Sequence, residues 1–178
     1  MKTNTNFDLI DKNKVNFLEN ILGSKFLYKK KIAPYGAHWI FFNENLNNKD
    51  LGLDGHPKRG KNIPLLKGYK RMFAGANLVF KKKIYFEDKI KKITEIKPLL
   101  KKKSDNENIY FLNLANTFFR DNLEVLKETQ TIVFVKNNHV SNKDKKKSNN
   151  VNLKLLHKKK FKFNNIDLFR YSALTYNS

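Results

Sequence analysis

The chain has 178 residues, 40% of them hydrophobic and 13% aromatic, which suits one sizeable core and is too short for two ordinary domains. Charged residues make up 30% of the chain and no apolar run reaches roughly 18 to 20 residues, which excludes a protein held in a membrane by helices. The absence of cysteine excludes disulfides and thiolate metal sites, and with no apolar leader at the start we expect a cytoplasmic protein.

The net charge of +21 is the strongest compositional signal, and a basic chain usually suggests nucleic acid. Only four of the 37 basic residues are arginine, however, whereas base and phosphate recognition favours the arginine fork. The charge is densest in residues 136–160, where nine basic residues and one acidic residue are typical of a solvated linker. Nucleic acid is therefore not the partner that we expect.

An amphipathic helix is predicted for residues 6–22, with Asn6 as its cap and Gly23 at its end. Its apolar residues are Phe7, Ile10, Leu18, Ile21 and Leu22. A Pro/Gly turn then leads into an aromatic run at residues 38–42. Residues 43–68 are rich in Asn, Gly and Pro without a period, which predicts a long ordered loop or a degenerate helix.

Three strands are predicted in the middle of the chain, over residues 76–86, 109–119 and 125–135. The first places Leu78, Phe80, Ile84 and Phe86 on one face. The second is apolar on both faces, as in a central strand, and a turn at residues 120–122 makes the third its antiparallel partner. Residues 90–99 are ambiguous, because isoleucines recur there at every third position, as on a helix.

A second amphipathic pattern follows the linker. Asn165 is a possible cap for a helix whose apolar face holds Ile166, Phe169, Ala173 and Leu174. We therefore expect a domain at residues 1–136, a Lys/Asn-rich linker at 137–160, and the start of a second structural unit at 161–178.

Several motifs occur in a fixed order in the first half of the chain. They are His38-Trp39 with Phe42, Leu51-Gly52, Asp54-Gly55-His56-Pro57, Arg59-Gly60, Arg71-Met72 and Ala74-Gly75. In this order they resemble the amino-terminal half of the MaoC-like double-hotdog hydratases, the group that includes mesaconyl-C4-CoA (3-methylfumaryl-CoA) hydratase and the fatty-acid-synthase-type dehydratase region. Residues 128–134 resemble the strand that closes the first hotdog of that family, and residues 168–177 resemble the start of the second.

The resemblance implies an α+β hotdog fold, in which a curved antiparallel sheet wraps a helix, with the start of a second hotdog unit at the carboxy terminus. It also assigns residues 90–99 to the sheet, against their helical spacing. For function it implies an acyl thioester of coenzyme A or acyl carrier protein as substrate, no cofactor, and a second hotdog chain or a homodimer as partner.

Hydration of an enoyl thioester needs a base, an acid and donors to the thioester oxygen. The resemblance implies that the acid and base lie in one loop, with Asn177 at the first position of an incomplete motif and the catalytic histidine about five positions later. None of the four histidines of the chain has that spacing. We therefore expect the amino-terminal half or subunit of an acyl-thioester hydratase or dehydratase, inactive alone.

The resemblance also suggests substrate-binding residues, namely His38, Trp39, Asp54, His56, Arg59 and Arg71. Structural alternatives stay open: the two histidines could serve packing, and residues 54–60 could form a tight turn fixed by an Asx hydrogen bond. No cluster of His or carboxylate residues predicts a metal site. Two further functions remain, a non-catalytic acyl-thioester-binding hotdog and, less favoured, a basic nucleic-acid-binding protein.

Overall fold

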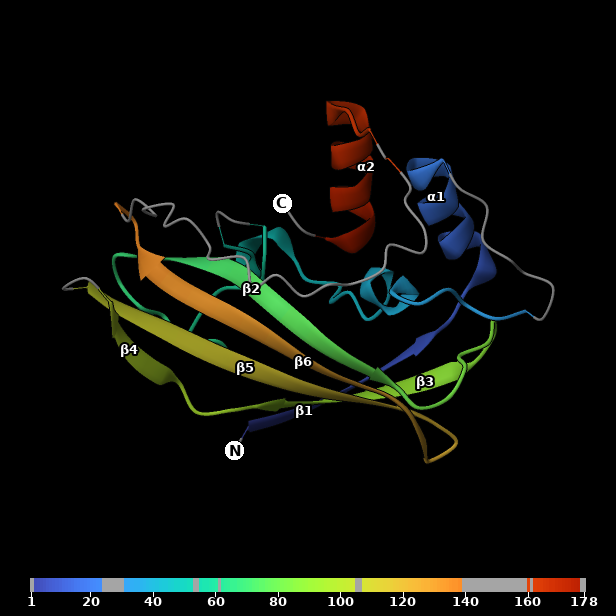
Figure 1. Ribbon diagram of the computed structural model, residues 1–178, viewed down its shortest axis with the longest axis horizontal. Helices are drawn as coiled ribbons and strands as arrows, with labels where there is room; N and C mark the ends of the chain where they lie inside the picture. Colours follow the sequence, from blue (N-terminus) through green and yellow to red (C-terminus); the bar gives the residue numbers. More distant parts are fainter. Residues whose placement is uncertain are drawn as a thin grey trace, which may run out of the picture.

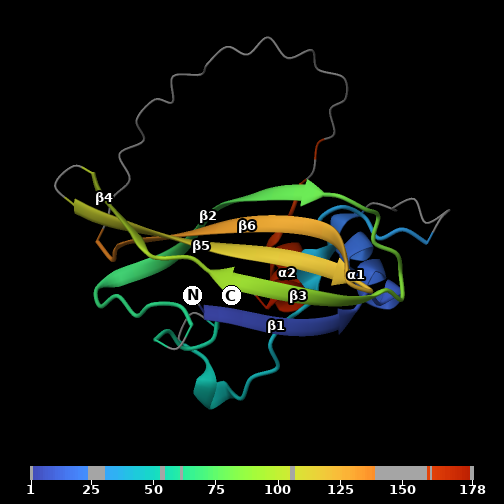
Figure 2. The same ribbon diagram turned by 90° about the horizontal axis from the view of Figure 1, so that it is seen from below.

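The computed structural model describes residues 2–23, 31–52, 55–60, 62–104, 107–138, 160 and 162–176. The elements are β1 (Lys2–Leu9), α1 (Lys12–Leu22), the 3-10 helices η1 (Ala37–Ile40) and η2 (Asn48–Asp50), β2 (Tyr69–Phe80), β3 (Lys89–Ile96), β4 (Leu100–Ser104), β5 (Glu107–Arg120), β6 (Leu123–Lys136) and α2 (Asn165–Thr175). The strands form one antiparallel sheet in the order β1-β3-β5-β6-β2, with β4 beside β5. Both α-helices and η1 lie on one face of this curved sheet, as Figures 1 and 2 show, which is the expected α+β arrangement.

The centre of the sheet is the β5–β6 hairpin. Its strands meet at the pair Arg120 and Leu123, and the two residues between them, Asp121 and Asn122, have φ angles of 47° and 65°. Positive φ at both central positions defines the hairpin turn whose twist matches that of the strands, and Asp and Asn tolerate it. The structure confirms both predicted strands and the turn that joins them.

Strand β2 differs from its prediction at both ends. It begins at Tyr69 instead of residue 76 and ends at Phe80, where the next two backbone N–H groups both donate to the Val125 carbonyl. Ile84 and Phe86 lie beyond the strand but still contact the core. The alternation therefore indicated correctly which side chains are inside, and it was wrong about the backbone that carries them.

The amino-terminal residues form a strand and not the start of a helix. β1 pairs with β3, so the predicted cap Asn6 lies inside a strand and Phe7 is 74% exposed. Helix α1 is capped instead by Asp11, whose carboxylate accepts the Lys14 N–H at 2.9 Å. Gly23 ends the helix with φ 55°, as predicted. The helix was predicted to begin too early because the backbone N–H and C=O groups of residues 2–9 bond to β3, which is distant in the sequence. A local hydrophobic pattern cannot indicate such a partner.

Most of the ambiguous stretch 90–99 belongs to the sheet, as the resemblance implied, since β3 covers Lys89–Ile96. In a strand, residues two apart share a face, so Ile90 and Ile96 lie on one face and Ile93 on the other. Ile90 is almost fully buried. The isoleucines that recur at every third position therefore lie on both faces of a strand and not on one face of a helix.

Helix α2 confirms the predicted carboxy-terminal helix, with its cap one residue earlier than expected. The Asn164 side chain accepts the N–H groups of Ile166 and Asp167, and the Asp167 carboxylate accepts the Asn164 N–H. Most of the linker predicted at 137–160 lies outside the described residues. No helix within the described ranges is long and apolar enough to cross a membrane.

The packing face of α2 differs in part from the predicted face. Tyr171 and Leu174 pack against the main core, whereas Ile166 and Phe169 are 68% and 73% exposed. The main core lies between the sheet and the helices and includes Val15, Leu18, Ile40, Phe41, Phe118, Val125 and Leu126. The assignment of residues 161–178 to a second hotdog unit remains a prediction.

Candidate functional site

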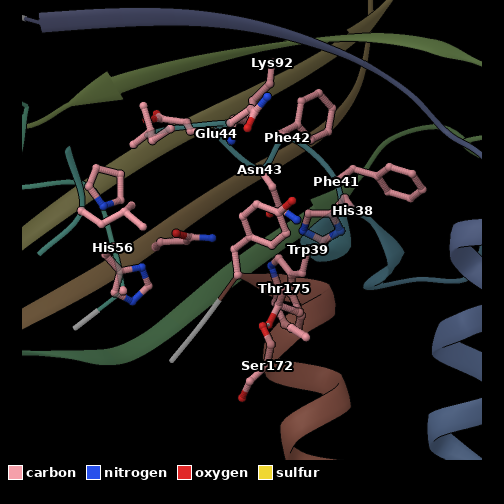
Figure 3. Close-up of a pocket in the computed structure, with 18 of the residues that line it drawn as sticks. His38, Trp39, Phe41, Phe42, Asn43, Glu44, His56, Lys92, Ser172 and Thr175 are labelled. Carbon is pink, nitrogen blue, oxygen red and sulfur yellow. The ribbon is translucent and has the colours of Figure 1, made fainter. Parts of the chain in front are cut away.

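A cavity of about 830 Å³ opens between the sheet, η1, the loop that follows η1, and the last turns of α2. Figure 3 shows His38 and Trp39 of η1, His56 of the loop, and Ser172 and Thr175 of α2 around this space. A hydrogen bond at 3.1 Å from the Asn43 side chain to the Leu174 carbonyl joins the loop to α2. Segments far apart in the sequence therefore build one wall.

A buried carboxylate, Glu128 of β6, lies in the wall of the cavity and is 3% exposed. Three side chains donate to it: Trp39 Nε1 and Gln130 Nε2 to Oε1, at 2.7 and 3.0 Å, and Asn116 Nδ2 to Oε2, at 2.9 Å. The Thr94 hydroxyl in turn donates to Asn116 Oδ1 at 2.7 Å. The network connects η1 with three neighbouring strands, and its side-chain donors replace the water that the buried carboxylate has lost.

The His38 imidazole completes the surroundings of Glu128. Its Nε2 lies 3.5 Å from Glu128 Oε1, which is longer than an ordinary hydrogen bond. The ring packs edge-on to Phe118 and Phe80, with centroids 5.4 and 6.1 Å away, and is 6% exposed. His38 is therefore held in the wall by packing and by Glu128.

Two opposed effects set the pKa of Glu128. Burial raises it, but the contact with His38 and the hydrogen bonds from Trp39 and Gln130 outweigh burial and lower the pKa from 4.5 to about 2. The carboxylate is thus ionised near neutral pH. A group with such a low pKa and three satisfied hydrogen bonds is a poor proton acceptor. Its hydrogen bonds connect η1, β5 and β6 within the wall.

A cation also lines the cavity. Lys92 of β3 is half-buried, and its Nζ lies 5.1 Å from the centroid of the Phe42 ring. Burial lowers its pKa, and the more distant charges of Glu128, Glu44 and Asp8 act in the opposite direction.

The structure brings some of the predicted substrate-binding residues together and separates others. His38, Trp39 and His56 all line the cavity. Arg59 does not, because its Nη1 donates to the Tyr69 carbonyl at 3.1 Å and so fixes the start of β2. Arg71 is likewise absent from the described lining. Asp54 and the predicted catalytic Asn177 lie outside the described residues.

Sequence reasoning did not identify the polar residues of the sheet as part of the site, although a signal was present. Glu128 is in phase with Leu126, Ile132 and Phe134 along β6, so a charged residue occupies a position of the inward-facing series. Asn116 on β5 and Lys92 on β3 interrupt apolar series in the same way. Polar residues at inward positions of a strand indicate a site or a buried network. Among the described residues, no group of three or more His, Asp or Glu side chains could hold a metal ion.

Comparison with known proteins adds to this geometry. The family model described as hydroxyacyl-thioester dehydratase type 2 matches residues 36–178. Mesaconyl-C(4)-CoA hydratase of Chloroflexus aurantiacus is 27% identical over 97 residues, which is 54% of this chain and 35% of the hydratase. The match thus spans about a third of that relative's length.

Among solved structures, the fold is similar to that of a chain in the ChsH1-ChsH2 complex from Mycobacterium tuberculosis. The TM-score is 0.55 with 14% sequence identity, and the superposition covers 76% of this chain and 84% of the other. This likeness confirms the hotdog fold that the motifs between residues 38 and 75 implied.

Proposed function

Since this chain belongs to the hydroxyacyl-thioester dehydratase type 2 family, we propose that it forms the acyl-binding hotdog of a hydratase or dehydratase that acts on acyl thioesters. The observation that carries the proposal is the cavity, which has aromatic side chains beside the hydrogen-bonded network of Glu128. Small-molecule sites commonly combine an apolar wall with a few fixed polar groups. Trp39 and His56 are the proposed contacts to the thioester, with His38 behind Trp39.

The proposed division of labour gives binding to the described residues and proton transfer to residues outside them. Hydration needs a base close to neutral pKa, and Glu128 does not meet that requirement because its pKa is about 2. The family resemblance places the acid and base in a loop that starts at Asn177 and ends at a histidine, and neither His38 nor His56 has that position. Both histidines lie instead in motifs for which the resemblance suggests substrate binding. We infer that the described residues contribute binding and do not themselves supply the base for hydration.

The proposed partner is a second hotdog chain or a second copy of this one. The ChsH1-ChsH2 structure is a complex of two named chains, which supports pairing as a means to complete such a site. A non-catalytic acyl-thioester-binding hotdog is the other candidate. The hydrogen bonds that satisfy Glu128 favour it, because this carboxylate is not free to accept a proton.

The test uses the chain alone with crotonyl-CoA and mesaconyl-CoA. Binding is followed by the fluorescence of Trp39, the single tryptophan, and hydration by loss of enoyl-thioester absorbance. We expect saturable quenching without turnover, and a Trp39→Phe variant removes the signal. Turnover at enzyme-like rates would contradict the division of labour, and absence of binding would contradict the acyl-thioester function itself.

A further inference from the structure

We propose that Lys92 forms an oxyanion subsite in the cavity, where the protein binds a carboxylate on the acyl chain or a phosphate on its carrier. The proposal rests on the proposed acyl-thioester function and adds the charge of the ligand to it. Of the described residues that line the cavity, Lys92 is the single Lys or Arg. In a chain with a net charge of +21, this position distinguishes it from the surface lysines.

The strand places the Lys92 side chain in the cavity wall. Lys92 pairs across the sheet with Phe118, and cross-strand partners project to the same face. Phe118 lines the cavity and is 1% exposed. Figure 3 shows Lys92 at the rim of the same space as Phe42 and Glu44.

The support beneath the ammonium group is fixed in an unusual backbone conformation. Phe42, whose ring lies below Lys92 Nζ, has φ 62° although it is not glycine. A bulky residue adopts this conformation only where its surroundings impose it. The Asp8 carboxylate accepts the Phe42 N–H at 2.7 Å and so holds the ring in place.

Lys92 has no carboxylate within ion-pair distance among the described residues. The nearby acids are engaged elsewhere: Asp8 accepts backbone N–H groups, and Glu128 accepts three side-chain donors. Glu44 is exposed to solvent. Withdrawal of a cation from water without a direct counter-charge costs free energy, and an anionic group of the ligand would recover it. Burial also lowers the pKa of Lys92, which agrees with a cation that lacks a direct partner.

Two sources could supply the anion, and matched ligands distinguish them. Crotonyl-pantetheine carries neither anion, fumaryl-pantetheine replaces its terminal methyl with a carboxylate, and crotonyl-CoA adds the phosphates. Affinity of the full chain for each ligand is measured by quenching of Trp39, which is 39% exposed in the cavity wall.

The variant is Lys92→Met, with two controls. Lys92→Arg keeps the charge. Lys91→Met removes a neighbouring lysine on the opposite face of the sheet, whose Nζ also lies 5.1 Å from the centroid of a phenylalanine ring, that of Phe119.

We expect Lys92→Met to leave the affinity for crotonyl-pantetheine unchanged. It should lower the affinity for one charged ligand about tenfold or more, as for loss of a charge-assisted hydrogen bond. Loss for fumaryl-pantetheine assigns the anion to the acyl chain, and loss for crotonyl-CoA assigns it to the carrier. Lys92→Arg should restore most of the affinity, and Lys91→Met should change none.

Equal affinities of wild type and Lys92→Met for all three ligands overturn the inference and leave the acyl-thioester function intact. Equal losses for all three, without rescue by Lys92→Arg, also overturn it, because a packing defect then explains the result. Absence of binding of every ligand to the wild type overturns both the inference and the proposed function.

Discussion

Glu128 shows how one residue can connect several elements of the cavity wall. Its carboxylate receives donors from η1, β5 and β6, so loss of the carboxylate group would leave Trp39 Nε1 and two amides without their acceptor. Buried donors that lose a charged acceptor destabilise a protein strongly. The same network holds the indole of Trp39 in the cavity wall, which links the stability of the fold to the shape of the pocket.

Glu128→Gln should lower the free energy of unfolding by about 3 kcal/mol near pH 7, because a pKa lowered from 4.5 to about 2 corresponds to that much preferential stabilisation of the ionised form. The folded pKa lies below the unfolded one, so this contribution is complete above pH 4.5 and is lost as the pH falls toward 2. Urea unfolding of both proteins from pH 7 to pH 2 measures the difference.

The control for this prediction is Glu95→Gln, which removes a surface ion pair with Lys97. Exposed pairs contribute little, so this variant should match the wild type at each pH. A constant difference between Glu128→Gln and wild type down to pH 2 would show that shape and not ionisation accounts for the role of Glu128.

At the scale of elements, the hairpin β5–β6 could be predicted from the sequence and the junction of β1 with α1 could not. The hairpin has strong local signals, two long apolar runs and an Arg-Asp-Asn turn. β1 has no such signal, because its paired residues in β3 are 80 to 94 positions away and its exposed face carries Phe7. Residues 2–9 are extended because they pair with β3, although the spacing of Phe7 and Ile10 is that of a helix.

The caps of α1 offer a direct test of this difference. Asp11→Ala removes the acceptor of the Lys14 N–H and should lower the free energy of unfolding by about 1 kcal/mol. Asn6→Ala, at the cap predicted from the sequence, should have a smaller effect because Asn6 lies within β1. Denaturant unfolding measures the free energy of unfolding of both variants. Equal decreases in this free energy would argue against Asp11 as the cap.

On the scale of the whole molecule, α2 is the element whose place matters most for function. Its last turns line the cavity, and Tyr171 and Leu174 pack against the same core as α1 and η1. The start of a second structural unit, as predicted for residues 161–178, would also carry a helix here. The structure adds that the carboxy-terminal half of this helix packs against the core through Tyr171 and Leu174. Three apolar residues of its amino-terminal half, Ile166, Leu168 and Phe169, are exposed.

Two leucines of α2 form a matched pair for testing its docking. Leu174→Ala should lower the free energy of unfolding by about 2 kcal/mol, because it removes methyl groups from the core contact, and should weaken acyl-thioester binding at the adjacent wall. Leu168→Ala, 63% exposed on the same helix, should change neither quantity. Thermal unfolding and Trp39 fluorescence give both readouts. Equal behaviour of the two variants would mean that α2 does not dock on this domain in solution.

The sequence by itself determined the two strands of the central hairpin, the turn at Asp121 and Asn122, and the family, because these depend on short-range patterns and on motifs such as residues 54–60. It also indicated His38, Trp39 and His56, which the structure brings to one cavity. Only the tertiary structure decided that Glu128 joins η1 to the sheet, that Arg59 serves β2 instead of the cavity, and that Lys92 faces inward. The physical reason is that these roles arise from contacts between segments up to 89 residues apart, where burial and the available donors, and not local spacing, determine what a side chain does.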